Sequence, residues 1–177
     1  TMEVRQQKLL AEEQRDMAEE QKLIIEEKNT EILDSITYAK RLQDAILPPT
    51  KLIKEWLSNS FVFYRPKDIV AGDFYWLENY SYQKEGRDYH NILFAVGDCT
   101  GHGVPGAMLS VVCTNALNDA VKKYKLVEPS RILSKVADLV KQFFNSEGTE
   151  IRDGMDIALC SLDIKNKKLY FSGANRP

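Results

Sequence analysis

The stretch that decides the fold is Val96–Met108, with the sequence VGDCTGHGVPGAM. The apolar run Ile92–Val96 leads into it and is typical of a buried strand that delivers Asp98 to its end. Glycines and small polar residues follow, and Pro105 then opens a segment with helical spacing, because proline is favoured in the first turn of a helix. A strand, a carboxylate, a glycine-rich turn and a helix start in this order place one charged oxygen at a sheet edge. The glycines there let the backbone approach a bound ion or phosphate closely.

A second carboxylate stands in similar surroundings upstream. Asp73 follows Gly72 and precedes the aromatic run Phe74–Trp76. Taken alone, the glycine motif also fits a tight turn in which Asp98 caps a helix, since short glycine motifs match by chance. Two aspartates that each follow a glycine beside a strand favour one shared site, and such oxygen ligands suit Mg²⁺ and Mn²⁺ rather than zinc.

The segments Ala71–Trp76 and Gly97–Ala107 resemble the two N-terminal motifs of the SpoIIE-type serine phosphatases. These are the bacterial branch of the metal-dependent (PPM, protein phosphatase 2C-like) protein phosphatases. The resemblance runs from about Ala45 to the last residue, with both motifs in the family's order. It implies hydrolysis of phosphoserine or phosphothreonine on a protein, with two Mn²⁺ or Mg²⁺ ions and no protein nucleophile. The implied substrate is a small anti-sigma-factor antagonist or similar bacterial signalling partner.

The motifs assign roles residue by residue. By resemblance, Asp73 and Asp98 are the catalytic metal ligands and Cys99 contributes its backbone carbonyl. Arg65 is the preferred phosphate ligand because a guanidinium binds phosphate bidentately, although a surface ion pair explains it equally well. His102 is either a general acid or a residue that holds the loop by hydrogen bonding, and we prefer the second. Four residues are expected to shape the loops: Gly72, Gly101, His102 and Gly103.

The cysteine side chains and two further aspartates are not expected to take part in the reaction. The three cysteines have no metal-type spacing, which favours reduced thiols in a cytoplasmic protein. A nucleophilic role for Cys99 is disfavoured, because no cysteine-protease signature accompanies it. Asp153 and Asp156 are left out of the site, because Asp156 lies between Met155 and Ile157 at a strand start, where a solvent-facing or turn role fits better.

Residues 1–47 predict one long helix that dimerises. Met2–Leu47 contains no glycine or proline, and two series of apolar residues recur seven apart, offset by one residue. The series are Leu10, Met17 and Ile24, then Ile25, Ile32, Ala39 and Ile46. A polar helix of this length needs a partner, so a parallel coiled-coil homodimer is favoured over a solvated linker helix. By resemblance, this helix transmits a signal from an upstream sensor, and Thr1–Glu3 looks like a cut inside a longer protein.

Residues 48–177 predict an α+β domain. Strands are expected at Phe61–Tyr64, Asp73–Tyr82 and Tyr89–Val96, followed by helices Val104–Tyr124 and Pro129–Phe144 and a hairpin of Met155–Ile164 with Lys168–Gly173. Met108 and Val111 are expected on the buried side of the first helix, and Phe143 on that of the second. The resemblance implies part of a four-layer α-β-β-α sandwich that continues for about sixty residues beyond Pro177. We therefore expect an incomplete metal site and exposed sheet edges that favour association.

Charge and hydropathy exclude some classes of function. The net charge of −2 gives no electrostatic argument for nucleic acid or an anionic membrane. The helix carries 7 basic and 11 acidic side chains, whereas the remainder is net +2, which suits an anionic phosphoprotein. No apolar run is long enough to span a membrane. A scaffold with a degenerate site and a small-molecule phosphohydrolase remain the competing hypotheses.

Overall fold

The structure is a computed structural model that describes residues 2–84, 86–145 and 153–175. It divides into two compact units, Thr1–Tyr38 and Ala39–Pro177. The predicted boundary after Leu47 falls one residue beyond the end of the first helix, α1, which runs from Met2 to Ile46 and contributes its last turns to the second unit.

The first unit is the long part of α1. Its apolar residues are exposed along the helix, with Met17 at 56% and Ile32 at 55% of full exposure. Ion pairs between residues four apart, such as Lys22–Glu26, add about 0.2–0.5 kcal/mol each, which is too little to stabilise a helix of this length alone. No helix in the described residues has the length and apolar character needed to cross a membrane.

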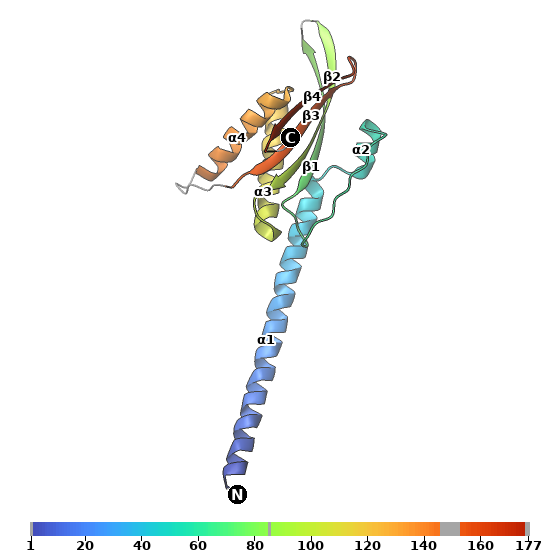
Figure 1. Ribbon diagram of the computed structural model, residues 1–177. Coiled ribbons are helices and arrows are strands. Elements are labelled where there is room, and N and C mark those ends of the chain that lie inside the picture. Colours follow the sequence, from blue (N-terminus) through green and yellow to red (C-terminus); the bar gives the residue numbers. More distant parts are fainter. Residues whose placement is uncertain (1, 85, 146–152, 176–177) are drawn as a thin grey trace. The chain divides into compact units, whose positions relative to one another are not determined.

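The second unit is built on one antiparallel sheet in the order β1-β2-β3-β4 (Figure 1). The strands are β1 (Phe74–Lys84), β2 (Arg87–Cys99), β3 (Met155–Asp163) and β4 (Lys168–Ala174). Phe74 pairs with Gly97, and Asp98 pairs with Asp156. Both predicted hairpins are confirmed.

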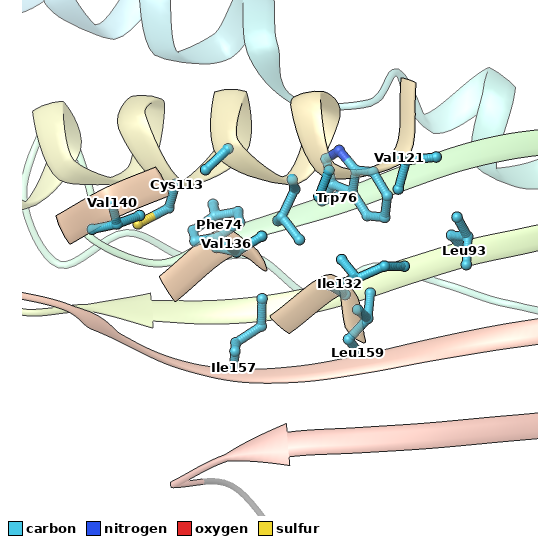
Figure 2. Packing of buried hydrophobic residues seen from close by; sticks show 14 of the residues in the cluster. Phe74, Trp76, Leu93, Cys113, Val121, Ile132, Val136, Val140, Ile157 and Leu159 are labelled. Atoms are coloured by element: carbon cyan, nitrogen blue, oxygen red, sulfur yellow. The ribbon is translucent and has the colours of Figure 1, made fainter. Parts of the chain in front are cut away.

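Helices α3 (Gly103–Asn118) and α4 (Pro129–Asn145) cover one face of this sheet (Figure 1). A π-helical turn, Asp119–Lys123, extends α3. Alternate residues of the strands point into the core, as the alternating burial of β3 demonstrates. Figure 2 shows this core, in which these side chains from both layers interlock: Phe74, Trp76, Leu93, Cys113, Val121, Ile132, Val136, Val140, Ile157 and Leu159.

The opposite face of the sheet, called the outer face below, meets α2 (Thr50–Trp56). Ile53 of α2 packs with Leu77 and Ile92 in a second, smaller cluster. Elsewhere on this face Val96 is 62% exposed. The described residues therefore form a sheet layer and a helix layer of an α+β fold, with α2 as a partial cover.

Three sequence predictions are wrong, one about a strand and two about buried side chains. Phe61–Tyr64 forms no strand, since none of the described strands pairs with it, and Phe61 and Phe63 are each 84% exposed. Met108 is 62% exposed and Phe143 is also exposed, because the buried stripes of α3 and α4 pass through Leu109 and Val140 instead.

Candidate functional site

Asp73 and Asp98 come together at one end of the sheet. Phe74 pairs with Gly97 in these antiparallel strands. Asp73, which precedes Phe74, therefore lies opposite Asp98, which follows Gly97. Residues opposite each other in antiparallel strands share a face and have Cβ atoms about 4.5–5.5 Å apart. Both side chains are exposed on the outer face, so two carboxylates project where the strands end.

Asp156 continues this row on the next strand. It pairs directly with Asp98 across β2 and β3, and its Oδ1 accepts a hydrogen bond of 3.1 Å from Asn175 Nδ2. Sequence reasoning set Asp156 aside, and only the strand register reveals its position beside Asp98. Among the described residues, no three His, Cys, Asp or Glu side chains gather tightly enough to form a preformed metal cage.

Glycines bring the two motif backbones into contact behind these carboxylates. A Cβ on Gly72 would lie 2.8 Å from the Gly101 carbonyl oxygen and 3.0 Å from that of Cys99. A Cβ on Gly106 would lie 2.6 Å from the same Gly101 oxygen. These positions admit no side chain without displacing backbone, which explains the residue type at each.

The loop after Asp98 depends on two further glycines in the left-handed region. Gly101 has φ +89° and Gly103 has φ +63°, which side chains disfavour. Between them, His102 Nδ1 lies 3.2 Å from Asp68 Oδ2, and the imidazole is otherwise well exposed. His102 is also the N-cap position of α3, so the interpretation of Asp98 as that helix's cap is wrong.

Thr100 ties the same loop to the start of β3. Its backbone N–H donates to the Gly154 carbonyl at 2.9 Å, and its hydroxyl oxygen lies 3.2 Å from the Gly154 N–H, which donates to it. This pairing extends the β2–β3 ladder past Cys99 and fixes the position of the loop relative to the start of β3, where Asp156 lies.

Arg65 shares a surface hollow of about 610 Å³ with Asp73 and Asp98. Tyr64, beside it, donates its hydroxyl to the Asp73 carbonyl at 3.1 Å and packs edge-on against Tyr75. Burial, and then the negative charge of Asp73, raise the pKa of Tyr64 to about 12, so this phenol stays protonated at neutral pH. The hollow thus combines one cation with two carboxylates.

Cys99 is unsuited to nucleophilic chemistry. Its side chain is 3% exposed and lies in the core beside Cys113. A thiol hydrogen bond with Cys113, together with burial, raises the pKa of Cys99 well above its ordinary value. A neutral, buried thiol neither attacks phosphorus nor binds metal, which leaves the backbone carbonyl as the group that this residue offers.

Comparison with known proteins decides the family. The family model described as "Stage II sporulation protein E (SpoIIE)" matches residues 88–177, half of the chain. The chain belongs to the SpoIIE family. Among solved structures, this SpoIIE chain is similar to the "SiaA-PP2C domain of Pseudomonas aeruginosa", with 30% sequence identity and a TM-score of 0.67. No curated protein sequence matches it.

The similarity to that structure covers 82% of this SpoIIE chain and 55% of the other chain, so this chain spans about half of the structure that it matches. The matched fold is that of a protein phosphatase 2C-like domain. The possible metal ligands where β1 begins and β2 ends are the two aspartate carboxylates, which lie beside the closely packed Gly72 and Gly101. These hard oxygen ligands fit Mn²⁺ or Mg²⁺.

Proposed function

We propose that this chain is part of a metal-dependent protein phosphatase that hydrolyses phosphoserine or phosphothreonine on a signalling protein. The observation that carries the proposal is the register that sets Asp73 opposite Asp98 at the glycine-built end of the sheet. Membership of the SpoIIE family supports the same reaction class. Free cysteines suit a cytoplasmic location for this part of the protein.

Asp73 and Asp98 would hold the metal, with the Cys99 carbonyl oxygen as the third group that this chain supplies. Bound Mn²⁺ or Mg²⁺ supplies a nucleophilic water at neutral pH and neutralises charge on the phosphoryl oxygens. The close packing of Gly72 against Gly101 fixes the spacing of the two motif loops, and therefore the separation of the ligands.

Arg65 would orient the substrate. It lines the same hollow as both aspartates, and its planar guanidinium pairs with two phosphate oxygens at once. Tyr64 positions the neighbouring backbone through its hydrogen bond to Asp73. The hollow is open and partly apolar, lined also by exposed Phe61 and Phe63, which suits a protein segment better than a small metabolite.

The regulatory part of the proposal concerns α1. Its exposed apolar residues recur at seven-residue spacing, which supports a parallel homodimer that carries an upstream signal to the phosphatase domain. A small anti-sigma-factor antagonist or a similar phosphoprotein is the proposed partner.

The test is Mn²⁺-dependent phosphate release from a phosphoserine peptide by the full-length protein. Asp98→Asn keeps the shape of the side chain and removes its charge, so activity is expected to fall at least a hundredfold. Asp138→Asn, at an exposed position of α4, makes the same change away from the site and should retain activity. Metal-independent release, or equal activity in the Asp98 variant, would refute the proposal, and a silent wild-type protein would favour the scaffold hypothesis.

A further inference from the structure

Gln43, in the last turns of α1, is buried although it is polar. Its side chain is 3% exposed, whereas its neighbours Leu42 and Asp44 are exposed. A buried amide is unfavourable unless its donors and acceptor find partners. The partners of Gln43 therefore show what this position is built to contact.

The Gln43 amide pairs with both backbone groups of Ala71. Its Nε2 donates to the Ala71 carbonyl at 2.6 Å, and its Oε1 accepts from the Ala71 N–H at 3.0 Å. The side chain thus takes the place that a neighbouring strand would occupy. Exchanging its oxygen and nitrogen would break both bonds, so the amide has one orientation.

The same nitrogen also reaches α3. Gln43 Nε2 donates to Ser110 Oγ at 3.0 Å, and that hydroxyl in turn donates to the Ala107 carbonyl at 2.7 Å. Ser110 and Ala107 are both buried in the first turns of α3, directly after the glycine loop that follows Asp98. One side chain therefore contacts the segment that carries Asp73 directly, and through Ser110 it is linked to Ala107, at the end of the segment that carries Asp98.

Only Gly72 separates Ala71, which Gln43 contacts, from Asp73. The next residue, Gly72, packs against the Gly101 and Cys99 carbonyls with no room for a Cβ, and Asp73 follows it. A shift of Ala71 would therefore move the Asp73 backbone together with Gly72 and the carbonyls that it contacts. The path from the Gln43 amide to the candidate ligand spans two residues.

We propose that Gln43 is a positioning residue that links the end of α1 to the Ala71–Trp76 segment and, through Ser110, to the start of α3, so that metal affinity at Asp73 and Asp98 depends on its amide. This inference rests on the proposed function, because it assumes that the two aspartates bind metal. It makes α1 the element whose displacement would loosen or tighten the site. A residue that only satisfied buried backbone groups would affect stability and leave metal affinity unchanged.

The test compares Gln43→Met with wild type in the full-length protein. Methionine keeps the length and flexibility of the side chain and removes the amide. Mn²⁺ binding is measured without substrate, from the electron paramagnetic resonance signal of free Mn²⁺. The expected result is a dissociation constant about tenfold higher, as for loss of outer-shell partners in other metal sites. The Mn²⁺ concentration for half-maximal phosphate release should rise by the same factor, with the KM for a phosphoserine peptide unchanged.

Two further variants keep the result decisive. Gln142→Met makes the same substitution at an exposed position of α4 and should match wild type. Ser110→Ala removes one hydrogen bond and leaves the Ala71 pairing intact, so it should fold and raise the Mn²⁺ dissociation constant about threefold, within the range of one hydrogen bond. If Gln43→Met fails to fold, the Ser110 variant decides alone.

Unchanged Mn²⁺ affinity in the folded Gln43 variant, or in the Ser110 variant where the first does not fold, would overturn the inference. A wild-type protein that binds no Mn²⁺ and releases no phosphate would instead refute the proposed function, and the inference with it. The wild-type measurement thus separates the two failures.

Discussion

Replacing Gly72 by alanine tests whether the two motif loops touch as described. The new Cβ would lie 2.8 Å from the Gly101 carbonyl oxygen, whereas ordinary contacts begin at 3.4 Å. The two backbones must therefore separate by roughly 0.6 Å, and neither partner is a flexible side chain that could yield. Overpacking of this kind costs about 1–3 kcal/mol, which corresponds to a fall of roughly 2–12 °C in Tm for a domain of this size.

The free energy of unfolding is measured by urea denaturation of Gly72→Ala and wild type. Gly154→Ala is the matched control, because a Cβ there meets no atom within 4 Å and the residue does not have a positive φ. It should change stability by less than about 0.5 kcal/mol. Separation of the loops should also weaken Mn²⁺ binding in the Gly72 variant. Equal urea midpoints for Gly72→Ala and wild type would refute the close contact on which the site depends.

Three further predictions concern other groups. The folded-state pKa of Tyr64 is about 12 against 10.0 for a free phenol, so unfolding releases a proton between these values and stability falls as pH rises from 10 to 12. Tyr64→Phe should flatten that fall and remove one late-ionising phenol from an ultraviolet absorbance titration. Ellman's reagent should modify Cys160 in the folded protein and reach buried Cys99 and Cys113 only after denaturation. Fast modification of all three thiols in the folded protein would contradict the burial of Cys99 and Cys113. Ile32→Glu should convert an α1-mediated dimer into a monomer by light scattering, and an unchanged mass would reject the coiled coil.

Most elements of the fold follow from local patterns in the sequence. The two hairpins and α4 have strong period-two or helical repeats, and the glycine motif marks the turn between β2 and α3. Phe61–Tyr64 alternates in the same way but forms no strand, because a strand needs a partner and the alternation cannot supply one.

The candidate site was predictable only in part. Asp73 and Asp98 stand out because each follows a glycine, and the observed register sets them opposite each other. Asp156 and Gln43 depend on long-range geometry. The first requires the β2–β3 register, and the second requires the docking of α1 on Ala71. For Gln43 a signal did exist, since it is a polar residue between Ala39 and Ile46 on an otherwise apolar stripe.

The most direct test of the central claim is the position of manganese in crystals of the full-length protein soaked in Mn²⁺, located by anomalous scattering. The account predicts a manganese peak bound by the Asp73 and Asp98 carboxylates, at about 2.0–2.3 Å as expected for hard oxygen ligands. Ordered aspartate side chains with no manganese between them, at Mn²⁺ concentrations that support phosphate release, would contradict it.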